Sequence, residues 1–133
     1  MRSAACVLIL DEERTHVLAI SRNKDTRDWG LPGGHTEPED GGDLHTTAVR
    51  ELKEETGIVV APINLYPIFT ARARTCLCTT FTIHGPPIHW PKNLRSKPFE
   101  GYVRWQRLEV LTSHNATFRV YAKRLFRHIG LLV

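Results

Sequence analysis

The stretch that decides the fold is residues 29–58, WGLPGGHTEPEDGGDLHTTAVRELKEETGI. It opens with a glycine-rich turn and passes through a segment with prolines and paired glycines, which is typical of irregular backbone. From Leu44 the apolar positions recur at helical spacing. Asp43 is the expected N-cap of this helix and Gly57 the expected C-cap. The stretch therefore predicts a turn followed by one amphipathic helix.

Half of the acidic residues lie in the same stretch. The chain has 133 residues and a formal net charge of +4, yet seven of its 14 Asp and Glu residues fall within residues 37–55. Glu51, Glu54 and Glu55 follow i, i+3, i+4 spacing and share one helical face. Such a face is either a solvated acidic surface or a site for a divalent cation, because Mg²⁺ and Mn²⁺ prefer carboxylate oxygens. Since Mg²⁺ commonly binds together with substrate phosphates, the second alternative indicates phosphate-ester or pyrophosphate chemistry.

These residues resemble the Nudix box, Gly-x5-Glu-x7-Arg-Glu-U-x-Glu-Glu-x-Gly-U, where U is a bulky apolar residue. Residues 50–58, RELKEETGI, match every specified position of its second half, and LPGG at 31–34 matches the usual lead-in. The first acidic position departs from the pattern. Asp40 stands there if the count starts at Gly34, but nine residues instead of seven separate it from Arg50. We interpret this departure as a two-residue insertion around the adjacent glycines 41 and 42.

The resemblance implies a fold and an activity. The expected fold is the Nudix fold, an α/β class α/β/α sandwich with a mixed β-sheet, as a single domain over residues 1–133 with the box-like segment at 34–58. The expected activity is Mg²⁺-dependent (or Mn²⁺-dependent) pyrophosphohydrolysis, in which a metal-activated water cleaves a nucleoside diphosphate linked to another moiety. Residues 73–76 lack the Pro or Tyr that marks some subfamilies, which favours a MutT-like nucleoside triphosphate pyrophosphatase. The alternative is a catalytically weak or inactive Nudix-fold module that binds a nucleotide or RNA.

The resemblance also assigns roles to individual residues. The expected metal ligands are the Gly33 carbonyl, Asp40, Glu51, Glu54 and Glu55. The expected catalytic residues are Glu51, Glu54, Glu55, Arg50, which pairs with a box glutamate, and Glu100, which lies five residues before Trp105. Without the motif, each glutamate would be read as an ordinary surface residue.

Substrate groups are assigned from residue chemistry. Arg72 and Arg74 alternate along a predicted strand and have the guanidinium geometry that suits phosphate. A basic loop before the glycine turn could steer an anionic substrate through Arg22, Lys24 and Arg27. Trp105 lies on a predicted strand and could stack on a base. Each has a structural alternative, namely a solvated strand or loop for the arginines and the core for the tryptophan.

The rest of the chain predicts several strands and a second helix. Strands are expected at Ala4–Leu10 and His16–Ser21 as a hairpin, at Ile58–Val60, Tyr66–Thr70, Ala71–His84 and Tyr102–Arg107, and a helix from about Phe118 to Ile129. On this helix, Arg119, Lys123 and Arg127 form a basic stripe that is either a solvated face or an RNA contact.

Composition narrows the functional class. The longest apolar run, Ala4–Leu10, is far shorter than a membrane helix, and no small-residue cleavage site follows it. Three cysteines exclude a disulfide framework, and Cys76 and Cys78 are expected as buried strand thiols. The sequence therefore predicts a cytoplasmic protein whose partner is a nucleotide-type small molecule and not a membrane, with RNA and a homodimer left open.

Overall fold

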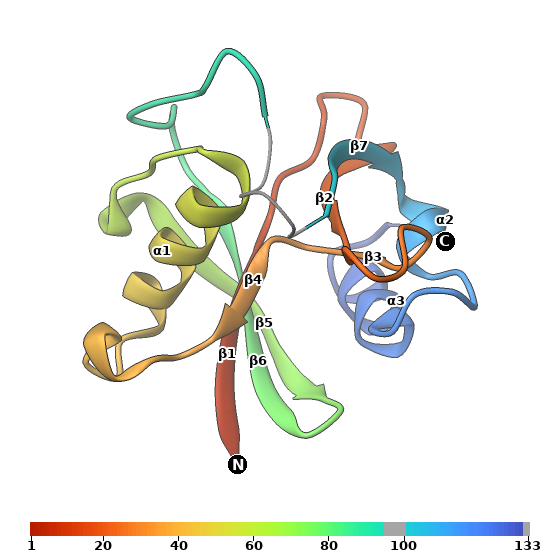
Figure 1. Ribbon diagram of the computed structural model, residues 1–133, viewed down its shortest axis with the longest axis horizontal. Coiled ribbons are helices and arrows are strands. Elements are labelled where there is room, and N and C mark those ends of the chain that lie inside the picture. Colours follow the sequence, from red (N-terminus) through yellow and green to blue (C-terminus); the bar gives the residue numbers. More distant parts are fainter. Residues whose placement is uncertain (95–100, 132–133) are drawn as a thin grey trace.

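Two β-sheets lie between helices on opposite sides (Figure 1). The structure is a computed structural model that describes residues 1–94 and 101–131. Its strands are β1 (Arg2–Leu8), β2 (His16–Ser21), β3 (Trp29–Gly30), β4 (Gly33–His35), β5 (Leu65–Ala73), β6 (Cys76–Ile83) and β7 (Val103–Arg107). Its α-helices are α1 (Leu44–Thr56), α2 (Leu108–Leu111) and α3 (Arg119–His128), with single 3₁₀ turns at Pro38–Asp40 and Pro62–Asn64. This arrangement confirms the predicted α/β/α sandwich.

The strands divide into one mixed and one antiparallel sheet. The four-stranded sheet has the order β4-β1-β6-β5, with β1 parallel to β6 and the other pairs antiparallel. The three-stranded sheet has the order β3-β2-β7 and is antiparallel. Strand β1 is central because its side chains alternate between two cores. Ala5 and Val7 pack toward α1, whereas Ala4, Cys6 and Leu8 pack toward α3.

Helix α1 begins and ends where the sequence predicts. The Asp43 side chain accepts a hydrogen bond from the His45 N–H at 3.0 Å, and Gly57 ends the helix with a φ of 82°. Ala48 and Leu52 on its inner face are fully buried against the core that contains β1. Glu51, Glu54 and Glu55 lie beside this inner face and are half-buried.

The predicted hairpin of the first two strands is wrong. The turn itself closes, since the Asp11 N–H donates to the His16 carbonyl at 3.0 Å and Leu10 forms a bridge with Val17. Beyond that bridge β1 and β2 enter different sheets. The physical reason is that both edges of β1 are already taken, one by β4 and the other by β6.

The predicted run Ala71–His84 is two strands and not one. Strands β5 and β6 are joined by a tight turn at Arg74 and Thr75, and Arg74 adopts a left-handed φ of 56°. No glycine or asparagine marks this turn in the sequence. Residues 58–60 contribute only an isolated bridge between Val59 and His89.

The last elements follow the prediction more closely. Strand β7 occupies all but the first residue of the predicted range, and α3 lies within the predicted helix. The short helix α2 was not predicted. None of the helices in the described part of the chain has the length and apolar character needed to cross a bilayer.

Packing of α1 on β1 makes a prediction about stability. Because Leu52 is fully buried, we expect Leu52→Ala to lower the free energy of unfolding by about 3 kcal/mol, through lost burial and a residual cavity. Leu77→Ala removes the same atoms from a side chain that is 44% exposed, and should change the free energy of unfolding by less than about 0.5 kcal/mol. Urea denaturation measures both, and equal losses would contradict the placement of α1.

Candidate active site

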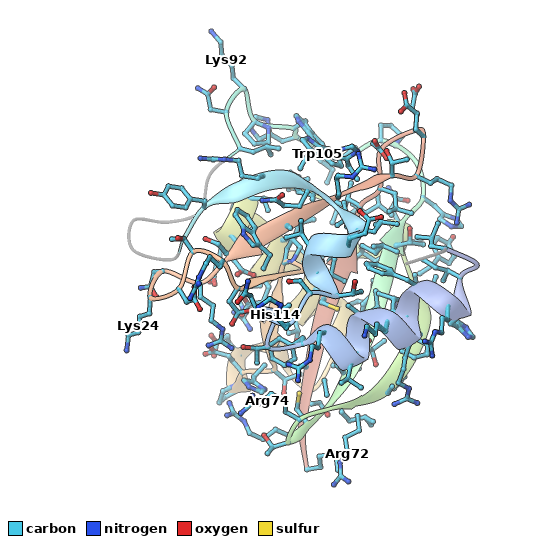
Figure 2. All side chains as sticks on the ribbon, turned by 90° about the vertical axis from the view of Figure 1, so that its right-hand side faces the viewer. Lys24, Arg72, Arg74, Lys92, Trp105 and His114 are labelled. Carbon is cyan, nitrogen blue, oxygen red and sulfur yellow. The ribbon has the colours of Figure 1, made fainter. Side chains whose placement is uncertain are left out.

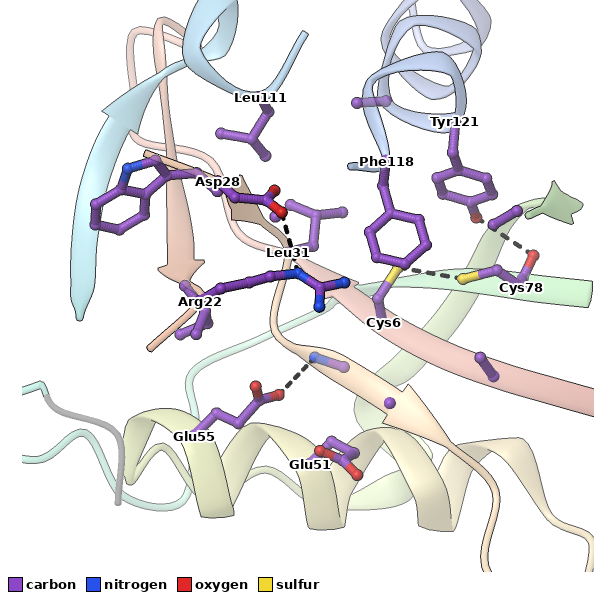
Figure 3. Close-up of a pocket in the computed structure, with 18 of the residues that line it drawn as sticks. Cys6, Arg22, Asp28, Leu31, Glu51, Glu55, Cys78, Leu111, Phe118 and Tyr121 are labelled. Atoms are coloured by element: carbon purple, nitrogen blue, oxygen red, sulfur yellow. Dashed lines mark hydrogen bonds and ion pairs between the residues drawn. The ribbon is translucent and has the colours of Figure 1, made fainter. Parts of the chain in front are cut away.

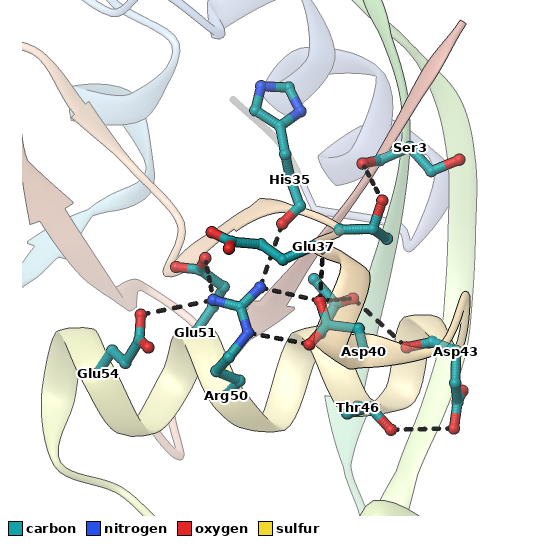
Figure 4. A network of polar contacts seen from close by, with 11 residues as sticks. Ser3, His35, Glu37, Asp40, Asp43, Thr46, Arg50, Glu51 and Glu54 are labelled. Atoms are coloured by element: carbon teal, nitrogen blue, oxygen red, sulfur yellow. Dashed lines mark hydrogen bonds and ion pairs between the residues drawn. The ribbon is translucent and has the colours of Figure 1, made fainter.

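Arg50, in the middle of α1, is the centre of a polar network that joins this helix to the segment before it (Figure 4). Its Nε donates to Asp40 Oδ1 at 3.0 Å and its Nη2 to Asp40 Oδ2 at 2.9 Å. The same guanidinium donates to Glu51 Oε1 at 3.0 Å and to the His35 carbonyl at 3.2 Å, and lies 3.5 Å from Glu54. One planar, permanently charged group therefore joins α1 to the segment before it.

Asp40 is the buried partner of that guanidinium. Its carboxylate also accepts hydrogen bonds from the Glu37 N–H at 2.9 Å and the Thr47 hydroxyl at 2.8 Å. Chiefly because of the hydrogen bonds from Arg50, the pKa of Asp40 lies well below its usual range. The carboxylate is only 4% exposed, so four polar hydrogen bonds replace its lost hydration.

The inserted glycines allow Asp40 to reach Arg50. Both Gly41 and Gly42 have positive φ, 63° and 78°, and they join the 3₁₀ turn at Pro38–Asp40 to the N-cap of α1. A residue with a Cβ would be strained in this conformation. The chain can therefore reverse between Asp40 and Asp43 while the box helix keeps its register.

The other glutamates of the face approach the glycine turn. Glu55 Oε1 accepts a hydrogen bond from the Gly33 N–H at 2.7 Å. A Cβ on Gly34 would lie 2.5 Å from Glu51 Oε1, and one on Gly33 would collide with the Ala5 carbonyl and Cys6. Glycine is thus required at Gly33 for β4 to lie against β1, whereas a Cβ at Gly34 would displace the Glu51 carboxylate.

Burial acts on Glu51. It raises the pKa of this carboxyl above its ordinary value, and the adjacent Arg50 opposes that rise. The carboxylates of Glu51 and Glu54 both lie beside Nη1 of Arg50, at 3.0 and 3.5 Å. The donor set is therefore three carboxylates next to a glycine backbone, which is the hard oxygen chemistry that fits Mg²⁺ or Mn²⁺. Within residues 1–94 and 101–131, however, no three His, Cys, Asp or Glu side chains already form a group that could hold a metal ion.

A cavity of about 480 Å³ opens beside these glutamates (Figure 3). Glu51 and Glu55 lie at one end, and Leu111, Phe118 and Tyr121 contribute an apolar and aromatic wall at the other. This volume is in the range of pockets that hold small organic ligands. The site therefore combines a carboxylate end with an apolar end of ligand size.

Thiols and hydroxyls line part of the cavity wall. Cys6 Sγ lies 3.7 Å from Cys78 Sγ and 3.1 Å from the Thr80 hydroxyl, and the Tyr121 hydroxyl lies 2.6 Å from that of Thr80. Cys76 and Cys78 are buried and free, as predicted. The hydrogen bond with Cys78, together with burial, raises the pKa of the Cys6 thiol, so this thiol is neutral at pH 7.

A buried carboxylate holds one arginine in the cavity wall. Asp28 is 7% exposed, its Oδ2 lies 3.0 Å from Nε of Arg22, and it accepts hydrogen bonds from the Thr117 N–H and hydroxyl. Arg22 lines the cavity, as does Lys24. The predicted Arg27 is not among the lining residues and pairs instead with Asp25 at 3.4 Å.

The other predicted substrate residues are not gathered in this cavity. Arg72 lies on the exposed side of β5, and Arg74 lies in the turn after that strand, so the predicted shared strand face is wrong. Arg74 lines a smaller cavity that adjoins the first, together with Arg22 and Phe118. Trp105 is 40% exposed on β7, outside both cavities. Glu100 lies outside the described residues, and its role stays a prediction.

Sequence reasoning missed three residues of the site. Asp28 and Thr117 meet across 89 positions of the chain, and neither belongs to a local motif. Phe118 was read as the start of a helical apolar face, although its ring reaches the cavity. Only the position of Asp28, directly before the glycine-rich turn, offered any signal.

The Asp40–Arg50 pair predicts a pH-dependent stability. Because folding lowers the pKa of Asp40, its ionised form stabilises the protein above the unfolded pKa of about 3.9, and this contribution is lost as pH falls toward the folded pKa. We expect Asp40→Asn to cost about 2 kcal/mol at pH 7, and the difference from wild type to shrink between about pH 5 and pH 2.

The matched control for this change is Asp43→Asn. Asparagine is also a good N-cap, so this variant should stay within about 0.5 kcal/mol of wild type. Chemical denaturation at several pH values measures all three proteins. A wild-type advantage over Asp40→Asn that is constant across pH would show that ionisation of Asp40 is not what stabilises the network.

Solved structures share this fold. The NUDIX domain of Shewanella oneidensis NrtR, complexed with ADP ribose, aligns with a TM-score of 0.68 at 18% identity over 96% of this chain and 86% of that one. A MutT NUDIX hydrolase from Burkholderia pseudomallei aligns with a TM-score of 0.65 at 18% identity over 92% of this chain and 95% of that one. A C. elegans Ap4A hydrolase binary complex aligns with a TM-score of 0.59 at 19% identity over 98% of this chain and 96% of that one. At these identities the likeness concerns the fold alone.

Sequence comparison identifies the family. Proteins named nucleoside diphosphate-linked moiety X motif 6 from Xenopus laevis and Homo sapiens are each 47% identical over 51 residues, which is 38% of this chain. These matches span 23% and 16% of the relatives' own lengths. The sequence pattern of the NUDIX domain matches residues 1–128. The chain therefore belongs to the Nudix hydrolase family.

Proposed function

We propose that this protein is a Mg²⁺- or Mn²⁺-dependent pyrophosphohydrolase that cleaves a nucleoside diphosphate linked to another moiety. A nucleoside triphosphate is the favoured substrate. The observation that carries the proposal is the cavity with the box glutamates at one end and the apolar wall at the other. Such a cavity suits a ligand that is charged at one end and has a flat ring at the other.

The residues of α1 have separate roles in this proposal. Glu51, Glu54 and Glu55, with the Gly33 carbonyl, would hold the cation, which when bound neutralises phosphate charge and lowers the pKa of a water. Arg50 holds Glu51 and Glu54 in place through its Nη1 atom. Asp40 was expected as a further metal ligand. Because both of its oxygens already accept hydrogen bonds, we assign it to positioning Arg50.

The far end of the cavity supports a nucleotide as the ligand. Phe118 and Tyr121 offer aromatic surface for a base. Arg22 offers a guanidinium whose orientation is fixed by Asp28. Two relatives of the same fold support the class of ligand, since one was crystallised with ADP ribose and another is an Ap4A hydrolase. A homodimer and a cytoplasmic location stay predictions of the sequence.

Catalysis is tested with Glu55→Gln, which keeps the shape of the side chain and its ability to accept from the Gly33 N–H. We expect hydrolysis to fall at least about 100-fold, because the change removes a charge that the cation needs. The assay would use Mg²⁺ and Mn²⁺ with canonical and oxidised nucleoside triphosphates, ADP-ribose, diadenosine polyphosphates and 5′-triphosphate RNA.

The control for this assay is Glu39→Gln. It makes the same chemical change at an exposed position outside the glutamate face and should leave turnover unaffected. Chelation of the metal should abolish turnover of wild type. Turnover that persists in the Glu55→Gln variant, and in wild type after the metal is chelated, would contradict the proposal. Binding of nucleotide without any turnover would support the alternative, a Nudix-fold binding module.

Phosphate binding is tested at Arg22. We expect Arg22→Ala to raise KM about tenfold and to change kcat little, because a phosphate contact made equally in the bound substrate and the transition state affects only binding. Steady-state kinetics on the best substrate measures both constants. A KM that rises in Arg27→Ala and not in Arg22→Ala would assign the phosphate contact to Arg27 instead of Arg22.

A further inference from the structure

Helix α3 carries a strongly basic surface. Its ten residues, RVYAKRLFRH, include five basic side chains and no Asp or Glu. Arg119, Lys123 and Arg127, spaced i, i+4, i+8, lie on one face and are exposed, and we call them the α3 stripe. No ion pair found within the described residues involves the α3 stripe. Cations aligned in this way repel one another and favour an anionic partner.

The packing of α3 shows what kind of anion fits. Tyr121, Ala122, Leu125 and Phe126 are buried in the core, and Tyr121 packs on Phe69 of β5 with ring centroids 5.5 Å apart. Val120, which is 65% exposed, is a single apolar side chain among the basic ones. The helix therefore has no apolar face left to insert into a bilayer, as a membrane-surface helix does. A polyanion that lies along the charged face needs no such insertion.

The α3 stripe begins next to a residue that lines both cavities. The smaller cavity shares Arg22 and Phe118 with the main cavity and adds Arg74 and Thr117. Arg119 follows Phe118 directly and begins α3. Figure 2, which shows α3 in front, places Arg74 below the helix on the same side of the molecule. Cationic groups thus lie at the main cavity, at the β5–β6 turn and, from Arg119 onward, on the outer face of α3.

Two features of this path indicate a role beyond solubility. Arg74 lies in the β5–β6 turn and its side chain lines the smaller cavity, next to Phe118. Phe118 is 38% exposed and lines both cavities. An exposed aromatic ring among cations is the arrangement that binds single-stranded nucleic acid, because bases stack on the ring while phosphates follow the charges.

We propose that the α3 stripe, together with Arg74, binds the phosphate backbone of a single-stranded nucleic acid whose 5′ end occupies the main cavity. This inference rests on the proposed function, since it extends the substrate outward from that site. It assigns the chain a substrate longer than a mononucleotide, with the terminal phosphates at the glutamates and the following nucleotides along α3.

The test measures binding of 5′-triphosphate RNA and DNA oligonucleotides of about two, five and ten nucleotides, labelled with fluorescein at the 3′ end. Fluorescence anisotropy at several salt concentrations gives the affinity. We expect affinity to rise with length, and Arg119→Ala/Lys123→Ala to lower it about tenfold for the longest strands. The slope of log affinity against log salt should become shallower by about 1.4, because two phosphate contacts are lost.

The control variant is Arg104→Ala/Arg107→Ala, which removes two exposed cations from β7 and the same total charge. It should bind the oligonucleotides like wild type. Both double variants should hydrolyse mononucleotides at the wild-type rate, since none of these residues lines either cavity. RNA and DNA compared at equal length show which sugar the path accepts.

Several outcomes would overturn the proposal. Affinity independent of length, or equal losses in both double variants, would show that α3 is a solvated face. Binding to phosphatidylserine vesicles that requires the α3 stripe and is not competed by oligonucleotides would show that the stripe binds a membrane surface and not a nucleic acid. Failure of the proposed function looks different. In that case no substrate is hydrolysed, while length-dependent binding that requires the α3 stripe is still observed.

Discussion

The hydrogen bonds between Arg50 and Asp40 are the constraint on which the site depends. They join the segment before α1 to the helix itself, and the same guanidinium holds Glu51 and Glu54. A buried carboxylate is costly unless its partners are in place, so the pair adds modest net stability but is expensive to break. Its main effect is geometric, because it fixes the glutamates relative to the glycine turn and β4.

Charge is separated across the molecule. The acidic residues gather on and before α1, whereas α3 has only basic charges, and the main cavity lies between these two helices (Figure 1). Such a separation orients an approaching anion, because its field draws the anion to the basic side first. Under the proposed function, a phosphate that reaches the glutamates enters an acidic region where a bound divalent cation would balance the charges.

The elements that the sequence predicted correctly are those with local causes. Helix α1 was predicted because its caps, Asp43 and Gly57, and its apolar spacing lie within one short stretch. The glutamate face follows from the same spacing. The Arg50–Asp40 contact crosses only ten positions, yet the resemblance to the Nudix box paired Arg50 with a box glutamate and assigned Asp40 to the metal.

The features that sequence reasoning missed have non-local causes. Whether β1 pairs with β2 depends on which strands occupy its edges, and β6 follows about 70 positions later. The cavity wall depends on Asp28 meeting Thr117, and nothing near either residue in the sequence indicates that contact. The turn at Arg74 lacks the glycine or asparagine that marks most such turns. These contacts are set by tertiary packing and not by propensity.

The parallel pairing of β1 with β6 also affects how the chain reaches its folded state. β1 has apolar side chains on both faces, and it can pair with β6 only after residues 76–83 have been synthesised. Long-range parallel pairing closes a large loop before any contact energy is gained, which slows folding. During that interval β1 is an exposed apolar segment that other chains can bind, so aggregation on the ribosome or during refolding is expected to begin at the N-terminal strand.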